Sequence, residues 1–316
     1  MKKGLGIACA VLICLSVIVF GFLNGISLSG QQWHTLKVTG IIAICSAAYC
    51  FVVGEISRNN SQMDKLWSLL PIAYTWVIAW MGGFRARLVI MACLVTLWGI
   101  RLTYNFAKKG AYKIRFWEGE EDYRWAVLRG KDPFRNKIVW AFFDLFFISI
   151  YQNFLVWLIS IPGIWMMDSD APFGVLDIVC IVLTLAFLVL ETVADLQQWR
   201  FQQKKKDLLN AGTPLDSMEY PYNKGFNTTG LWNRFRHPNY LGEQGFWIAI
   251  YLFSLGCGIN HYVFFNPSVL GCMLLVLLFL GSSTLGESIS SSKYPEYAEY
   301  QKTVFKYLPI RKYRND

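Results

Sequence analysis

Residues 226–243, FNTTGLWNRFRHPNYLGE, gather the side chains of this chain that are best suited to chemistry. Arginines and a histidine precede Pro238, which fits the first turn of a helix that continues into an apolar segment. Arginine forks and the backbone N–H groups of a helix start both bind anions. Polar groups at a membrane boundary are costly unless they bind something. The stretch therefore predicts a site for an anionic ligand, with the candidates Arg236, His237, Asn239, Tyr240 and Glu243.

A second polar pattern, ETVADLQQWRFQ, lies at the end of a long apolar segment. Glu191, Asp195 and Gln198 are spaced i, i+4 and i+7, so they share one helix face. Carboxylates in a membrane span are costly when they face lipid, so we expect this face to point into the bundle. There it would accept hydrogen bonds from ribose hydroxyls, an amide or an arginine. A salt bridge from Glu191 to Arg101 or Arg236 is the structural alternative.

A third pattern, WGIRLTYNFAKKG, carries one arginine in an otherwise apolar segment. Arg101 must extend its charge to the boundary or pair it. Pairing with Glu191 or holding a ligand phosphate would each satisfy that need. Asn105 follows one helical turn later, so the sequence adds Arg101 and Asn105 to the candidate ligand-binding residues.

Other polar groups have less specific surroundings. In the N-terminal half, Glu55, Asp64 and Tyr74 are each typical of a membrane boundary when taken singly. In the C-terminal tail, Glu287 fits either a ligand contact or a structural role. Three tail tyrosines recur every three residues and predict an aromatic edge on an interfacial helix: Tyr294, Tyr297 and Tyr300.

The composition predicts the elements that must position these residues. The chain is 54% hydrophobic and only 16% charged, whereas soluble domains carry about a quarter charged residues. We expect one integral membrane domain over residues 1–316, an all-α, polytopic transmembrane helix bundle of about eight spans. The count is seven if one of the two short segments, the third or the seventh, does not cross the membrane. The expected spans are roughly 4–26, 37–57, 66–83, 87–106, 138–162, 173–197, 242–259 and 267–287.

The net charge of +9 follows the predicted topology. Lysine and arginine gather at 108–137, at 200–236 and in the C-terminal tail, so the positive-inside rule places these segments and both termini in the cytoplasm. Arg85 and Arg87 fall on the opposite side. Because the charge forms no single stripe, no nucleic acid partner is expected. The expected location is the plasma membrane of a bacterium or the endoplasmic reticulum of a eukaryote, with a lipid bilayer as partner.

Metal chemistry is not expected. The eight cysteines lie in apolar segments with no C-x-x-C spacing, and the three histidines form no metal-binding pair.

The two long basic connections are expected to differ in structure. The first should contain a short interfacial helix around 119–130, and 199–232 should be a loop because of its turn-forming residues.

The combination of GLWNRFRHPNYLGE, ETVADLQQ, WGIRL and a Y-x-x-Y…P ending resembles the uncharacterised membrane proteins grouped with the steroid 5-alpha-reductase C-terminal domain, over roughly residues 60–310. The resemblance implies a helical membrane fold with a cytoplasm-facing NADPH cavity. It also implies reduction of a carbon–carbon double bond conjugated to a carbonyl, in a lipophilic sterol or isoprenoid-like enone. In such a reduction, hydride reaches the β carbon and an acid protonates the enolate.

The resemblance also implies roles for particular residues. Such reductases pair a carboxylate in an early span with a tyrosine just before the arginine that matches Arg101. Asp64 is a loose match for the carboxylate. Trp98 stands where that tyrosine is expected, so Tyr74 or Tyr104 would have to substitute for it as the hydroxyl acid. The positions that match cofactor-binding residues are Arg101, Glu191, Asp195, Arg236, His237, Asn239, Tyr240 and Glu243.

Two alternatives stay open. Isoprenylcysteine and phospholipid methyltransferases also carry R-H-P-x-Y-x-G and a glutamate-to-tyrosine ending, and they bind S-adenosylmethionine. The ETVADLQQ face and the G-L-W lead-in favour the reductases. The third reading is an inactive membrane scaffold, because Trp98 has no hydroxyl to donate.

Overall fold

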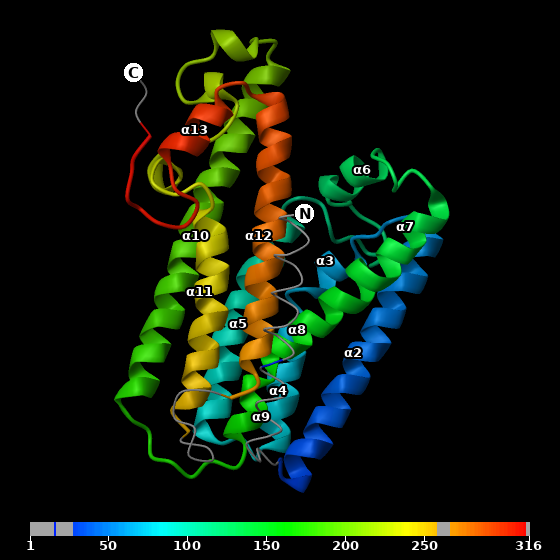
Figure 1. The fold of residues 1–316 in the computed structure, drawn as a ribbon, viewed down its shortest axis with the longest axis vertical. Helices are drawn as coiled ribbons and strands as arrows, with labels where there is room; N and C mark the ends of the chain where they lie inside the picture. The colour runs from blue at the N-terminus through cyan, green and yellow to red at the C-terminus, as the bar shows by residue number, and fades with distance from the viewer. Residues whose placement is uncertain (1–15, 17–27, 258–265, 314–316) are drawn as a thin grey trace. The chain divides into compact units, whose positions relative to one another are not determined.

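The computed structural model describes residue 16, residues 28–257 and residues 266–313. Within these residues every regular element is a helix, and no strand is present (Figure 1). The all-α prediction is therefore confirmed for the described part of the chain.

Five helical segments among the described residues are long and apolar enough to cross a bilayer, so the protein is a multi-pass integral membrane protein. They agree with five of the predicted spans. They are Gly30–Ser57 (α2), Ala86–Ala107 (α5), Lys137–Met166, Val175–Asn210 (α10) and Val269–Lys293 (α12). The segment Lys137–Met166 comprises α7 (Lys137–Phe143), the π-helix η1 (Asp144–Tyr151), α8 (Gln152–Ser160) and α9 (Pro162–Met166).

The other three predicted spans have different outcomes. The span at 4–26 lies outside the described residues. The span at 66–83 appears as α4 (Leu70–Met81), whose 12 residues are too few to cross a bilayer alone. The span at 242–259 corresponds to α11 (Pro238–Leu255), which is not among the five candidate spans. The count of eight stays a prediction.

The contacts divide the chain into two compact units. The first unit comprises residues 1–180 and 250–274, and the second comprises 181–249 and 275–316. The prediction of one domain over the whole chain stays a prediction.

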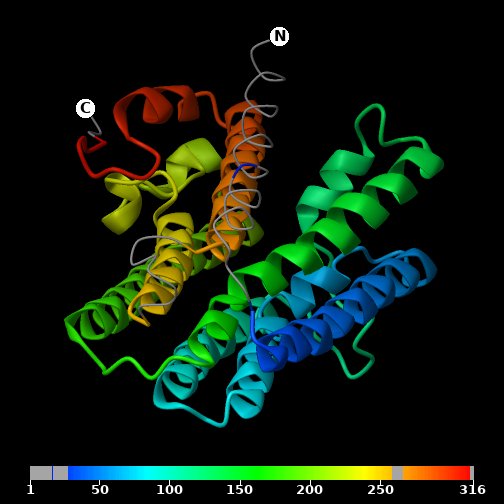
Figure 2. The ribbon, with the colours of Figure 1, turned by 60° about the horizontal axis from the view of Figure 1, so that its bottom comes forward.

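The first unit is built around α2, α4, α5 and the segment from α7 to α9. The helix α4 packs on α5 and α8, and α2 packs on η1 and α8. Figures 1 and 2 both show α2 running beside the α7–α8 segment. The start of α2 is fixed by a capping box, in which the side chains of Ser29 and Gln32 satisfy each other's backbone N–H groups.

The arginines that fell on the wrong side of the predicted topology are held by ion pairs. Arg87 makes a bidentate contact with Asp177, at 2.7 Å from Nε and 2.8 Å from Nη2, and both side chains are buried. Arg85 pairs with Asp170 at 2.8 Å. Because the positive-inside rule counts Lys and Arg and is little affected by acidic residues, the topology expected from the loops stays a prediction.

The connection at 108–137 is anchored within the first unit. It contains α6 (Tyr123–Arg129), close to the predicted short helix. Buried Lys65, on α3 (Gln62–Leu66), donates to the carbonyls of Phe116 at 2.8 Å and Glu118 at 2.7 Å. This basic connection is therefore an ordered part of the unit.

In the second unit, α10 continues to Asn210, so the predicted loop at 199–232 is wrong over its first twelve residues. The physical reason is local. The stretch WRFQQKKKDLLN has no Gly or Pro and is rich in residues of good helix propensity. The remaining part contains only the 3₁₀ turns η2 (Leu215–Ser217), η3 (Tyr222–Lys224) and η4 (Gly230–Asn233).

Two glycines allow α11 to approach α10 closely. A Cβ atom at Gly242 would lie 2.5 Å from the Cβ of Glu191, and one at Gly245 would lie 2.3 Å from the ring of Phe187. Neither distance is possible in a real contact. The glycines therefore set how near the start of α11 lies to the polar face of α10.

Candidate functional site

The second unit brings the two main polar patterns together. On the first turn of α11, Asn239 Nδ2 donates to Asp195 Oδ1 of α10 at 3.1 Å. Two residues along α10, Gln197 Oε1 accepts from the backbone N–H of Leu231 at 2.9 Å. The segment that precedes α11 is thus tied to the same turn of α10 that carries Asp195.

Buried acceptor atoms lie along these two helices. Gln198 and Asn239 each have a buried side-chain oxygen with no hydrogen-bond partner among the described residues. Glu191 and Glu243, one turn away from Asp195 and Asn239 respectively, are also buried. The buried oxygens of Gln198 and Asn239 are costly when they lack a donor. The arrangement therefore fits a ligand group rich in donors, such as the hydroxyls of a ribose or a carboxamide.

Arg236 contacts Glu287 and two backbone carbonyls of the C-terminal tail. Its Nε donates to Glu287 Oε1 of α12 at 2.8 Å, and its Nη1 donates to the carbonyls of Gln301, at 2.8 Å, and Val304. The side chains of Arg236 and Glu287 are only 13% and 9% exposed. The guanidinium therefore ties the C-terminal tail to the entry of α11, and its role as a ligand contact stays a prediction.

His237 shares the same carboxylate. Its Nε2 lies 2.9 Å from Glu287 Oε1, and its ring stacks on Tyr240 with centroids 5.2 Å apart. Burial lowers the pKa of His237 below its ordinary value, and this outweighs the opposing effect of Glu287. His237 is therefore a neutral, oriented ring at neutral pH.

Gln301 completes the surroundings of Glu287 by donating from Nε2 to Oε2 at 3.0 Å. Lys306 Nζ lies 3.9 Å from the same oxygen and donates to Ser283 Oγ at 3.0 Å. The sequence marked Glu287 as ambiguous between two roles. The contacts show it as the centre of a hydrogen-bonded network that links α11, α12 and the tail.

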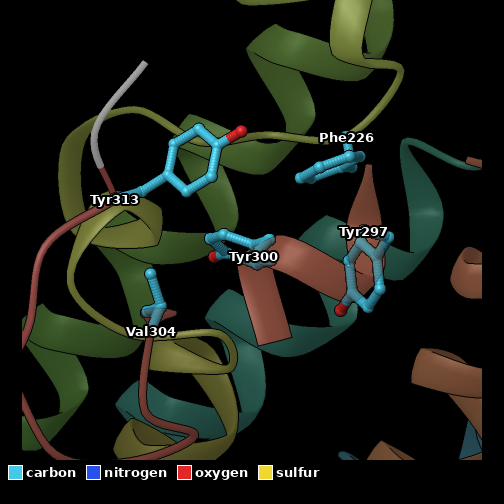
Figure 3. Packing of buried hydrophobic residues seen from close by; sticks show 5 residues of the cluster. All are labelled: Phe226, Tyr297, Tyr300, Val304 and Tyr313. Atoms are coloured by element: carbon cyan, nitrogen blue, oxygen red, sulfur yellow. The ribbon is translucent and has the colours of Figure 1, made fainter. Parts of the chain in front are cut away.

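An aromatic cluster supports this network. Figure 3 shows Tyr300 between Phe226 and Tyr313, with Tyr297 and Val304 at the edges, and all five residues are buried. The Tyr300 hydroxyl donates to the carbonyls of Trp232 and Phe235, which lie just before Arg236.

The i, i+3 spacing correctly placed Tyr297 and Tyr300 on one side of α13 (Tyr297–Thr303). Both pack inside the second unit, however, and do not line an interfacial edge. Phe226 and Tyr313 could not have been joined to them from the sequence, because no spacing relates residues so far apart.

The first unit holds the remaining predicted residues. Asp64 Oδ2 accepts from Trp125 Nε1 at 2.9 Å, which ties α3 to α6. Burial raises the pKa of Asp64, and Asp122 adds to the rise, while Arg124 opposes it. Tyr74 is fully buried, and its hydroxyl has no hydrogen-bond partner among the described residues.

The residues on α5 have varied surroundings. Trp98 is fully buried, and Arg101 and Asn105 are partly buried. Tyr104 is 61% exposed, and Lys108 Nζ lies 4.3 Å from its ring centroid. Of the three candidate acids, Asp64 and Tyr74 are therefore sheltered and Tyr104 is exposed.

No group of three or more His, Cys, Asp or Glu side chains that could hold a metal occurs among the described residues.

Comparison with known proteins gives the family. The chain is 35% identical over 275 residues to an uncharacterized protein of Schizosaccharomyces pombe, covering 82% of this chain and 77% of that protein. No solved structure matches the chain. Residues 50–304 match the family described as Protein of unknown function (DUF1295). Because this match includes most of the chain and both polar patterns of the second unit, the protein belongs to the DUF1295 family.

Proposed function

We propose that this protein is an NADPH-dependent membrane reductase that acts on a carbon–carbon double bond conjugated to a carbonyl, in a sterol or isoprenoid-like enone. The observation that carries the proposal is the contact between Asn239 and Asp195. It joins the carboxylate face of α10 to the entry of α11, where the residues resembling cofactor ligands were expected.

The residues present fit the polar parts of a dinucleotide. The buried oxygens of Gln198 and Asn239 and the carboxylate of Asp195 supply acceptors for ribose hydroxyls and a carboxamide. Phosphate requires positive charge and N–H donors. Because Arg236 is held by Glu287, exposed Arg234 and the first-turn N–H groups of α11 are the donors that would meet it.

Bound NADPH would supply the hydride, and the chain must supply the proton. Trp98 cannot do so, because an indole has no hydroxyl. Tyr74 is the best suited of the candidate acids, since its buried hydroxyl has no partner among the described residues. The Asp64 carboxylate already accepts a hydrogen bond from Trp125, and the Tyr104 side chain is largely exposed on the protein surface. Tyr74 is thus proposed to protonate the enolate.

The proposed topology has eight spans with both termini in the cytoplasm. It rests on the basic connections at 108–137 and 200–236 and on the basic tail. An even number of spans places the two ends on one side. The membrane would be the plasma membrane in a bacterium or the endoplasmic reticulum in a eukaryote.

Ligand-induced thermal stabilisation of the purified full-length protein tests the cofactor. At a concentration one hundred times its Kd, a ligand that binds only the folded state adds about 2.7 kcal/mol. We expect NADPH to raise the melting temperature of the wild type and Asn239→Ala or Asp195→Asn to reduce the rise. Asn210→Ala, at the exposed end of α10, should keep the wild-type rise.

Three outcomes would contradict the proposal. Stabilisation by S-adenosylmethionine alone would favour a methyltransferase. No response to NADPH, NADH or S-adenosylmethionine would favour an inactive scaffold. An equal response of Asn239→Ala and wild type would remove the contact between α10 and α11 from the binding site.

A further inference from the structure

The first unit has a compact surface loop, residues 110–120, that takes no part in the proposed reduction. The two ends of the loop meet, because the Glu120 N–H donates to the Gly110 carbonyl at 3.0 Å. The base is tight, since a Cβ atom at Gly119 would overlap the Ala111 carbonyl oxygen. Closed loops of this kind are packed by their own side chains and are frequently functional.

The inner side of the 110–120 loop is fixed to α3. The Tyr112 hydroxyl donates to the Lys65 carbonyl at 2.8 Å, and the Tyr112 ring lies against Phe116 with centroids 5.8 Å apart. The buried Lys65 ammonium donates in turn to the carbonyls of Phe116 and Glu118. The loop therefore keeps one side against the unit and presents the other side outward.

The outer side combines apolar and basic residues. Ile114 is fully exposed, and Trp117 is 48% exposed. Lys113 and Arg115, on either side of Ile114, are exposed as well. Isoleucine and tryptophan gain free energy when their apolar surface leaves water. Lysine and arginine can lay their apolar stems along the same surface while their charged ends stay in polar surroundings. The outer side therefore suits a boundary between apolar and charged surroundings.

The loop lies close to the end of a candidate membrane span. The helix α5 ends at Ala107, three residues before Gly110. At that end Tyr104 is 61% exposed, and Lys108 Nζ lies over its ring, a pairing suited to the membrane–water interface. Seven residues separate Ile114 from Ala107, and they reach at most about 25 Å when fully extended. The outer side is therefore within reach of the lipid headgroups around α5.

The charge around the loop is mainly positive. Four exposed cations lie within residues 108–115: Lys108, Lys109, Lys113 and Arg115. Two exposed carboxylates accompany them, Glu118 and Glu120, and Glu118 pairs with Arg115 at 3.2 Å. Clusters of about four or more Lys and Arg directly beyond a transmembrane helix attract anionic lipids. The charge of the loop is therefore complementary to an anionic bilayer surface.

We infer that the outer side of the 110–120 loop docks on the bilayer that holds the protein. Ile114 and Trp117 enter the interface, and Lys113 and Arg115 contact the phosphates of anionic lipid headgroups. A soluble polyanion would satisfy the cations but leave Ile114 in water, whereas a lipid surface satisfies both. The inference does not depend on the proposed reduction.

Photo-crosslinking of the full-length protein in nanodiscs tests this surface. The photoreactive residue p-benzoylphenylalanine replaces Ile114, and the nanodiscs contain phosphatidylcholine and phosphatidylglycerol in equal amounts. Mass spectrometry after irradiation identifies the adducts. We expect lipid adducts in which phosphatidylglycerol exceeds phosphatidylcholine several-fold, because each Lys or Arg near an anionic surface strengthens binding about fivefold. High salt should reduce the excess, since it screens exposed charges.

Charge variants of this photoreactive protein provide the comparison. Lys113→Gln combined with Arg115→Gln should bring the two lipids close to equal yield. The matched control is Lys204→Gln combined with Lys206→Gln, which removes the same charge at exposed positions of α10 and should keep the excess.

Three outcomes would overturn the inference. Adducts to protein alone would show that Ile114 does not meet lipid. Equal yields of the two lipids without charge variants would exclude headgroup recognition. An excess that survives the loss of Lys113 and Arg115 would place that recognition elsewhere. If the protein with the photoreactive residue at position 114 does not fold, the same residue in place of Trp117 gives an independent reading.

Discussion

At the scale of single residues, Glu287 determines which contacts Arg236 and His237, within residues 226–243, make in the folded protein. It accepts from Arg236, His237 and Gln301, and Lys306 lies nearby. These contacts turn the Arg-His pair inward to hold the tail.

The first prediction concerns this carboxylate. Glu287→Gln leaves the buried guanidinium of Arg236 without its counter-charge, which costs about 3 kcal/mol for a buried pair. We expect a clear fall in the melting temperature of the detergent-solubilised protein. The matched control is Glu299→Gln, whose 3.4 Å pair with Lys302 is exposed. Equal effects of the two substitutions would contradict the buried network.

The second prediction concerns His237. Burial holds its pKa below the ordinary value of 6.5, so its contribution to stability is present above that pH and is lost as pH falls through the lowered pKa. The chain has three histidines, so the His237 imidazole NMR signal can be assigned by its loss in His237→Gln. Glu287→Gln should lower the pKa further, because Glu287 favours the charged ring. Titration of His237 at or above 6.5 would contradict the burial effect.

At the scale of elements, α10 and α11 are joined by small residues as well as by polar contacts. Gly242 and Gly245 let α11 approach Glu191 and Phe187. Polar contacts such as Asn239 to Asp195 then become possible within the second unit. A close helix pair at a polar boundary thus needs both the glycines and the hydrogen bonds.

The third prediction tests this packing. Gly242→Ala and Gly245→Ala should each destabilise the protein by about 1–3 kcal/mol, because overpacking forces the helices apart. Gly281→Ala on α12 is the matched control, since no atom lies within 4 Å of the added Cβ. Alanine is the better helix former, so the control should be neutral or slightly stabilising. Thermal melting measures all three, and a stable Gly245→Ala would contradict the close approach.

At the scale of the whole molecule, the charge pattern and the apolar helices describe a protein that spans the bilayer several times. The five candidate spans account for most of the long apolar runs. In the expected topology Arg85 and Arg87 fall opposite the basic connections, and each forms an ion pair.

The fourth prediction tests the proposed topology. In bacterial spheroplasts that express the protein, a membrane-impermeant thiol reagent should label Asp170→Cys and should not label Lys131→Cys or Lys302→Cys before lysis. All three positions are exposed, and the native cysteines of the unsubstituted protein provide the background. Labelling of Lys131→Cys in intact spheroplasts would contradict the placement of the basic connections.

The sequence by itself determined the helical class, five of the spans and the short helix in the first basic connection, because apolar length and helical periodicity are local properties of the chain. It also marked Asp195 and Asn239 as candidates, since their spacing places each on a polar helix face. Only the tertiary structure decided that these two meet and that Glu287 engages Arg236 and His237. These contacts join residues tens of positions apart, and the packing of helices selects them from many partners that are equally compatible with the local pattern.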